Sequence, residues 1–144
     1  MNDYRGLWHG KDADSGKWVT GDLLQIPQMG EHGKVDSTKP AIMERTPVAR
    51  CLFVDPSTLG ECAGIPDKND KLIFEGDIVK TLETDSNGKQ RCFPVVHSHG
   101  AFWLYDELLD TKLDFLGSYE KEALEIIGNV FDNPELLKGE NDEM

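Results

Sequence analysis

Short apolar runs alternate with turn-forming residues along most of the chain. Gly, Pro, Asn or Asp interrupts these runs every several residues, a spacing that favours many short strands over long helices. Asp14-Ser15-Gly16 and Asn87-Gly88 each separate two apolar segments, and both predict hairpin turns. The pattern therefore predicts a mainly β fold.

Two stretches depart from this pattern. From Pro27 to Pro47 glycines and prolines are frequent, and we expect an irregular loop there with one short strand near residues 41–44. Towards the C-terminus, Ser118 predicts the start of a short helix, and Asn133 with Pro134 predicts a final helical turn. One or two short helices are therefore expected beside the strands.

The dipeptide Gly-Asp occurs twice inside apolar segments, as Gly21-Asp22 and as Gly76-Asp77. One flat strand over residues 72–79 would place Asp77 among apolar neighbours. A break at Gly76 removes this conflict, because glycine accepts positive φ and aspartate can bond nearby amides. The same reasoning predicts a structural turn at Gly21-Asp22. The alternative is a carboxylate pair, Asp22 with Asp77, that holds a divalent cation or performs acid–base chemistry.

Length and charge narrow the class of protein. The 144 residues can form one folding unit with a real core, which we place at residues 1–138, either undivided or as lobes 1–46 and 47–138. The net charge of −12 disfavours direct binding to nucleic acid or to anionic membranes, because both need clustered Lys and Arg. We interpret residues 139–144 as a disordered acidic tail.

Cysteine usage and hydropathy indicate the compartment. The chain has three widely spaced cysteines, an odd number that suits free thiols in a reducing cytosol. No apolar run approaches the roughly 18 residues of a membrane-spanning helix, and the first ten residues lack a signal-peptide pattern. We expect a cytoplasmic protein with no membrane association.

His97 and His99 are the candidate metal ligands. Two apart on one strand, they could face the same ion, with Cys92 or Asp106 completing a tetrahedral set. Their spacing is not a zinc signature, and their position before Gly100 favours exposed turn residues. No nucleophile elbow, phosphate-binding loop or other catalytic motif occurs. We expect no cofactor and no enzymatic activity.

Four segments resemble the YopX family, small proteins encoded mainly by bacteriophages and prophages. They are VDPSTLG at 54–60, GIPDKNDKLIFEGDIV at 64–79, GAF at 100–102 and IGNVFDNPEL at 127–136. The resemblance covers most of residues 4–137 and is least supported over the Pro27 to Pro47 stretch. Two positions depart from the family pattern: Asp70 stands where glycine is common, and Phe74 where tyrosine is common.

The resemblance implies a fold and a mode of action but no chemistry. It implies a large mixed or antiparallel sheet, a portion similar to an SH3-like barrel, and a tendency to self-associate. It implies no established activity, and it supplies no catalytic or binding residue to carry over.

Three functions remain open from the sequence. The first is a non-catalytic phage or prophage accessory protein that acts as a homo-oligomer and through contacts with an unknown phage or host protein. The second is an acidic mimic of nucleic acid that inhibits a basic host or phage DNA-handling protein, suggested by the net charge of −12. The third is a metal-dependent enzyme, which would need His97, His99, Asp22 or Asp77 to converge.

Overall fold

The computed structural model describes residues 6–138, so the acidic tail expected at 139–144 lies outside the described residues. The chain divides into two compact units, Met1–Cys62 and Ala63–Met144. The division falls inside one strand, whereas the alternative lobes inferred from the sequence meet after residue 46. The part of the chain that the structure describes holds no helix with the length and apolar character needed to cross a bilayer.

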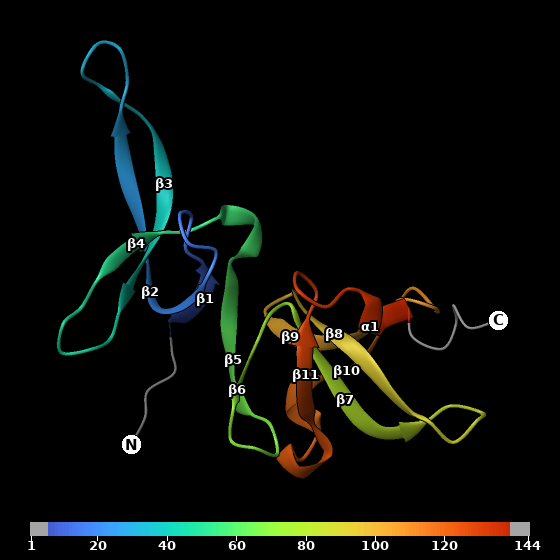
Figure 1. The fold of residues 1–144 in the computed structure, drawn as a ribbon. Coiled ribbons are helices and arrows are strands. Elements are labelled where there is room, and N and C mark those ends of the chain that lie inside the picture. The colour runs from blue at the N-terminus through green and yellow to red at the C-terminus, as the bar shows by residue number, and fades with distance from the viewer. Residues whose placement is uncertain (1–5, 139–144) are drawn as a thin grey trace. The chain divides into compact units, whose positions relative to one another are not determined.

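Unit 1 is built from antiparallel strands in the order β4-β3-β2-β1-β5 (Figure 1). Val19, Ile42 and Val54 form its buried apolar cluster, against which Trp8 and other partly buried side chains pack. Its elements are β1 (Leu7–Lys11), β2 (Trp18–Met29), β3 (Val35–Glu44), β4 (Cys51–Phe53), the 3₁₀ turn η1 (Pro56–Thr58) and β5 (Gly60–Pro66), which continues into unit 2.

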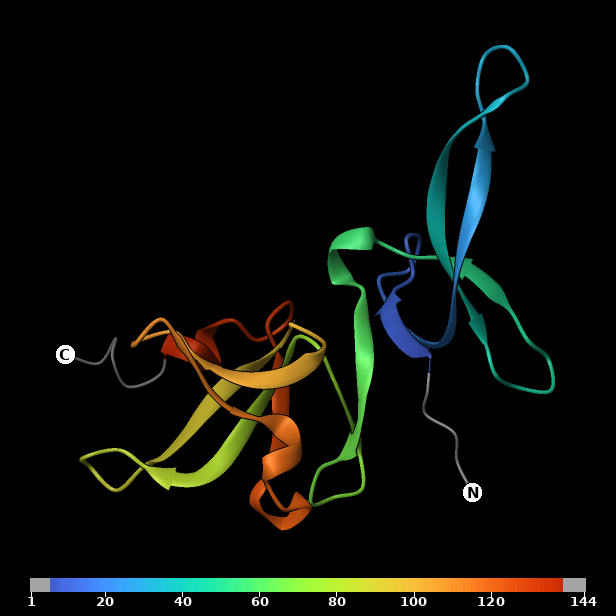
Figure 2. The same cartoon turned by 180° about the vertical axis from the view of Figure 1, so that it is seen from behind.

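A two-stranded ribbon extends from this sheet. β2 pairs with β1 only over Trp18–Asp22, and β3 pairs with β4 only over Ala41–Met43, within the described residues. Further out the two strands pair with each other alone, as far as Met29 opposite Val35. We call residues 23–39 the ribbon. Figures 1 and 2 show it from both sides, without a third strand of unit 1 beside its outer half.

The expected irregular loop between Pro27 and Pro47 is therefore wrong. Pro27 lies within β2 opposite Thr38, and the residues expected to form one short strand are the end of the ten-residue β3. Proline lacks an N–H and is tolerated in a strand where that position faces an unpaired edge. The outer edges of the ribbon meet this condition, so proline does not break the pairing.

Unit 2 contains a five-stranded antiparallel sheet in the order β10-β9-β8-β7-β11. Ile73, Val79, Leu104 and Leu124 are fully buried in its core, together with Phe93 and other apolar side chains. Its elements are β6 (Leu72–Phe74), β7 (Asp77–Thr84), β8 (Gln90–Ser98), β9 (Ala101–Asp106), β10 (Thr111–Phe115), the 3₁₀ turns η2 (Leu116–Ser118) and η3 (Lys121–Ala123), β11 (Glu125–Asn129) and α1 (Glu135–Lys138).

The mainly β prediction is confirmed, and the helices are short as expected. The final helix α1 follows Pro134, as predicted. The helix expected after Ser118 is absent from the described residues; the 3₁₀ turns η2 and η3 occupy its place. Ser118 does not cap a helix, because its Oγ donates a hydrogen bond back to the Phe115 carbonyl at 2.7 Å. The SH3-like partial barrel stays a prediction.

Candidate functional site

Gly21 and Asp22 do not form a turn; they lie inside β2, and this prediction is wrong. Gly21 pairs with Trp8 on one side and with Glu44 on the other. A Cβ atom at Gly21 would overlap the backbone carbonyl of Met43, so glycine serves a close approach of strands rather than a bend. The Asp22 carboxylate accepts hydrogen bonds from the Arg45 guanidinium at 2.7–3.2 Å, which lowers its pKa.

The second Gly-Asp pair lies at a turn between β6 and β7. Gly76 has a φ of +94°, and the Asp77 carboxylate accepts a hydrogen bond from the Phe74 amide at 2.8 Å. Asp77 is 7% exposed, and burial raises its pKa to about 7, with a further rise from the nearby Asp67 charge and an opposing effect of the Phe74 hydrogen bond. Its carboxyl group therefore takes up a proton near neutral pH.

Asp67 is fully buried, and its carboxylate holds the turn between β5 and β6 through hydrogen bonds. Its Oδ1 accepts the amides of Asn69 and Lys71, and its Oδ2 accepts the amide of Ile126, each at 2.9 Å. The carboxylate thus joins the β5–β6 turn to β11. Asp70, at the position where glycine is common in the resembled family, adopts a φ of +63° in this turn.

The candidate metal ligands each have another role. His97 stacks on Phe102 with ring centroids 4.5 Å apart, and His99 occupies the β8–β9 turn with a φ of +54°. The Cys92 thiol donates to the Leu136 carbonyl at 3.3 Å, and Asp106 pairs with Arg91. Among residues 6–138 no three His, Cys, Asp or Glu side chains group as a metal site.

Asp22 and Asp77, the two carboxylates of the alternative paired site, lie in different units of the chain. Asp22 belongs to unit 1 and bonds Arg45 there, while Asp77 belongs to unit 2 and bonds Phe74 there. Each carboxylate is therefore accounted for by its own unit.

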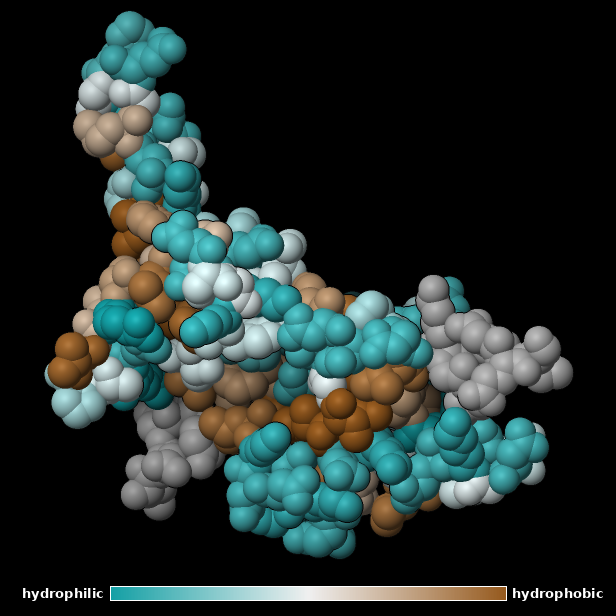
Figure 3. All heavy atoms as spheres, in the orientation of Figure 1, coloured by the Kyte–Doolittle hydropathy of each residue, from teal (hydrophilic) through white to brown (hydrophobic). Residues whose placement is uncertain are grey.

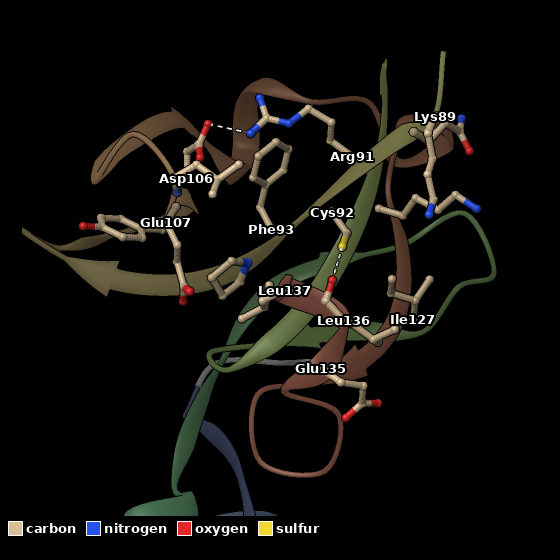
Figure 4. A pocket seen from close by; sticks show the side chains of 15 residues that line it. Lys89, Arg91, Cys92, Phe93, Asp106, Glu107, Ile127, Glu135, Leu136 and Leu137 are labelled. Carbon is tan, nitrogen blue, oxygen red and sulfur yellow. Dashed lines mark hydrogen bonds and ion pairs between the residues drawn. The ribbon is translucent and has the colours of Figure 1, made fainter. Parts of the chain in front are cut away.

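A cleft lies within unit 2 and is shown in Figure 4. It is a cleft of about 320 Å³, at the lower end of the roughly 300–1,000 Å³ of clefts that hold small ligands. It is lined by Lys80 of β7, by residues 89–94 on and before β8, by residues 105–108 at the end of β9, by Ile127 of β11, and by Glu135, Leu136 and Leu137 of α1.

An ion pair between the partly exposed Arg91 and the buried Asp106 fixes one wall of this cleft. Arg91 Nη2 lies 2.8 Å from Asp106 Oδ2, whose side chain is 1% exposed, and the guanidinium lies 4.7 Å from the centre of the Phe93 ring. Burial by itself would raise the pKa of Asp106, but the hydrogen bonds from Arg91 and from the Leu109 and Leu108 amides outweigh it, so the pKa lies below its ordinary value. Arg91 is therefore held in one orientation.

The opposite side of the cleft is mainly apolar, and we call its Leu136 and Leu137 side chains the floor. Figure 4 shows Leu136 and Leu137 of α1 beside Cys92, with Glu135 on the same short helix. Lys80 lies directly opposite Cys92 in the β7–β8 ladder, and within the described residues it makes no ion pair. The cleft thus combines an apolar floor with side chains of both charges at its rim, an arrangement that suits the end of a peptide hairpin or a small amphipathic ligand.

Sequence reasoning named few of these residues. Asp106 entered only as a fourth metal ligand, although its place before Leu108 and Leu109, whose amides it accepts at 3.0 and 3.3 Å, is typical of an aspartate at a turn. Arg91 carried no local signal, since its partner lies 15 residues away along the chain.

The comparisons with known proteins concern the family and the fold. The YopX protein family model matches residues 4–138. Protein yopX from Bacillus subtilis has a solved structure that is 24% identical, covers 96% of this chain and 98% of its own, and superposes with a TM-score of 0.53. Protein EF1440 from Enterococcus faecalis is 18% identical, with 90% and 96% covered and a TM-score of 0.50. No curated protein matches the chain. At these identities the two structures show a shared fold alone.

Proposed function

Because this chain belongs to the YopX family, we propose that it is a non-catalytic accessory protein of a bacteriophage or integrated prophage, acting in the host cytoplasm through self-association and contacts with other proteins. The observation that carries this proposal is the ribbon. A two-stranded ribbon is marginally stable by itself in water, and within residues 6–138 no third strand pairs along the outer half of this one. Contact with a partner would cover it.

The surface of the ribbon supports a protein partner. Met29 and Val35, which face each other at its outer end, are 65% and 57% exposed. Figure 3 shows a hydrophilic tip with more apolar residues following it along the ribbon. An apolar group beside a polar rim is typical of surfaces that bind other proteins.

The test is light scattering after size exclusion, over a range of protein concentrations. The full chain is expected to form a stable oligomer, and Met29→Lys/Val35→Lys to be monomeric, because two charges replace the exposed apolar pair. The matched control Val48→Lys/Leu82→Lys adds the same charge at side chains that are 80% and 66% exposed elsewhere. A monomeric full chain, or an oligomer that the ribbon variant leaves intact, would refute the role given to the ribbon.

The acidic-mimic alternative has a weaker basis in the arrangement of carboxylates. Several of them have internal partners: Asp55, Asp67 and Asp85 accept backbone amides of their own turns, while Asp22 and Asp106 pair with arginines. Capture of basic DNA-handling proteins that disappears as salt is added would nevertheless favour the mimic. The accessory role predicts capture that persists at high salt.

A further inference from the structure

The ribbon and the cleft have complementary chemistry. The ribbon ends in the apolar pair Met29 and Val35, and the turn between them carries Glu31 and Lys34, both exposed. The cleft presents an apolar floor beside cations and carboxylates. An apolar pair flanked by one acid and one base therefore corresponds, feature by feature, to an apolar floor flanked by side chains of both charges.

The tip of the ribbon is also a compact, defined structure. The Gly30 amide donates to the Lys34 carbonyl at 2.6 Å, and Gly33 closes the turn with a φ of +71°. Within the described residues, Glu31 and Lys34 make no ion pair of their own. Binding would therefore not have to break an existing charge pair at the tip.

One charged side chain of the cleft is already fixed in position before any ligand binds. Asp106 and the Phe93 ring already hold the Arg91 guanidinium in place, so its ordering cost does not fall on binding. Lys80 stands in the adjacent strand without an ion pair among the described residues. A volume of about 320 Å³ can accept a few side chains from a hairpin end, but not a whole domain surface.

We infer that the cleft of unit 2 receives the ribbon tip of a second copy of this chain, with Met29 and Val35 on the Leu136 and Leu137 floor and Glu31 directed at Lys80 and Arg91. This inference rests on the proposed self-association and names its surfaces. The contact joins two different surfaces, so each copy gives one ribbon and receives another. Such a contact builds a closed ring, or an open filament where the rotation does not close.

Complementation between two variants tests this pairing. Met29→Lys/Val35→Lys removes the ribbon contact and keeps the cleft, whereas Leu137→Glu places a charge on the cleft floor and keeps the ribbon. Each variant alone is expected to be monomeric, with a dissociation constant raised about tenfold or more. Mixed together, they retain one intact ribbon and one intact cleft, and are expected to form a dimer that goes no further.

A second, milder cleft variant tests the same contact in case Leu137→Glu does not fold. Lys80→Gln removes a partly exposed charge without touching the floor, and it is expected to weaken self-association several-fold while the circular dichroism spectrum stays that of the unaltered chain. Val48→Lys/Leu82→Lys again serves as the control and is expected to assemble normally.

The outcomes separate this inference from the proposed function. If the ribbon variant is monomeric while Leu137→Glu and Lys80→Gln assemble as the unaltered chain does, self-association stands and the cleft is not its receptor. If both single variants are monomeric but their mixture forms no dimer, the ribbon and cleft do not bind each other. If the unaltered chain is itself monomeric, both proposals fail together. Only the mixed dimer supports the inference.

Discussion

Single buried aspartates hold backbone amides and an arginine in place in unit 2, and the environments of their carboxylates differ. Asp67 is fully buried and bonds three amides, while Asp106 is buried against an arginine. Asp77 is buried near the Asp67 carboxylate and accepts a hydrogen bond from the Phe74 amide. Titration of Asp77 is therefore expected to make the stability of unit 2 depend on pH.

Asp77→Asn is expected to flatten the pH dependence of stability. With its pKa raised to about 7 in the fold, the protonated carboxyl stabilises unit 2 fully below about pH 4, and this contribution is lost as the pH rises through about 7. The loss reaches at most about 1.4 kcal/mol per pH unit. Asparagine keeps an oxygen for the Phe74 amide but cannot ionise.

Urea unfolding between pH 4.5 and pH 7.5 measures this effect. The free energy of unfolding of the unaltered chain, relative to that of Asp77→Asn, should fall as the pH rises. Asp36→Asn, which removes one exposed charge, is the control and should follow the unaltered chain. Parallel curves for Asp77→Asn and the unaltered chain would show that Asp77 is ionised throughout this range.

At the scale of elements, the sequence predicts the strands that bury one face and the turns between them. The hairpin turn at Asn87-Gly88 and the final helical turn after Pro134 follow from local residue chemistry, and the structure contains both. The ribbon was missed because its strands bury little, so its sequence lacks the alternation that marks a half-buried strand. Gly21 was misjudged because the backbone of β3, distant in sequence, determines its role.

Likewise, the cleft could not have been found from sequence. Its walls come from β7, β8, β9, β11 and α1, and only the fold brings these segments together. Asp106 and Arg91 are each unremarkable in their local sequence; their ion pair exists because β8 and β9 are neighbours in the sheet. Site prediction therefore failed where long-range pairing decides.

Pro27→Thr is expected to increase aggregation of the chain. Pro27 lies in the ribbon, where β2 has no neighbour on its outer edge among the described residues, and a missing N–H there interrupts edge-to-edge pairing. Threonine restores the donor and favours strand structure. Light scattering at 37 °C and thioflavin T fluorescence would record the change, with Gln25→Thr as the control on the same strand. Equal scattering by both variants would contradict a protective role of the proline.

At the scale of the whole molecule, each unit has a buried apolar cluster of its own among the described residues. Val19, Ile42 and Val54 belong to unit 1, whereas the cluster around Ile73 and Leu104 belongs to unit 2. Each unit thus carries apolar burial of its own. Cooperative opening is expected to follow these clusters.

Ile42→Ala and Ile73→Ala form a matched pair for this expectation, since both side chains are fully buried. Each is expected to cost about 2–5 kcal/mol of stability in its own unit. Hydrogen exchange resolved by peptide should show Ile42→Ala lowering protection mainly in β1 to β4, and Ile73→Ala mainly in β7 to β9. Equal loss of protection in both units for each variant would mean that the chain opens as one body.

The ribbon lies outside both clusters, so the binding role proposed for it is separate from the apolar burial that stabilises each unit. None of residues 23–39 belongs to the buried apolar cluster of either unit. Substitutions along the ribbon can therefore change which surface it fits at little expense to the cores. Under the proposed function, a chimera that carries the ribbon of one relative on the body of another would keep the stability of its body and take the binding preference of its ribbon.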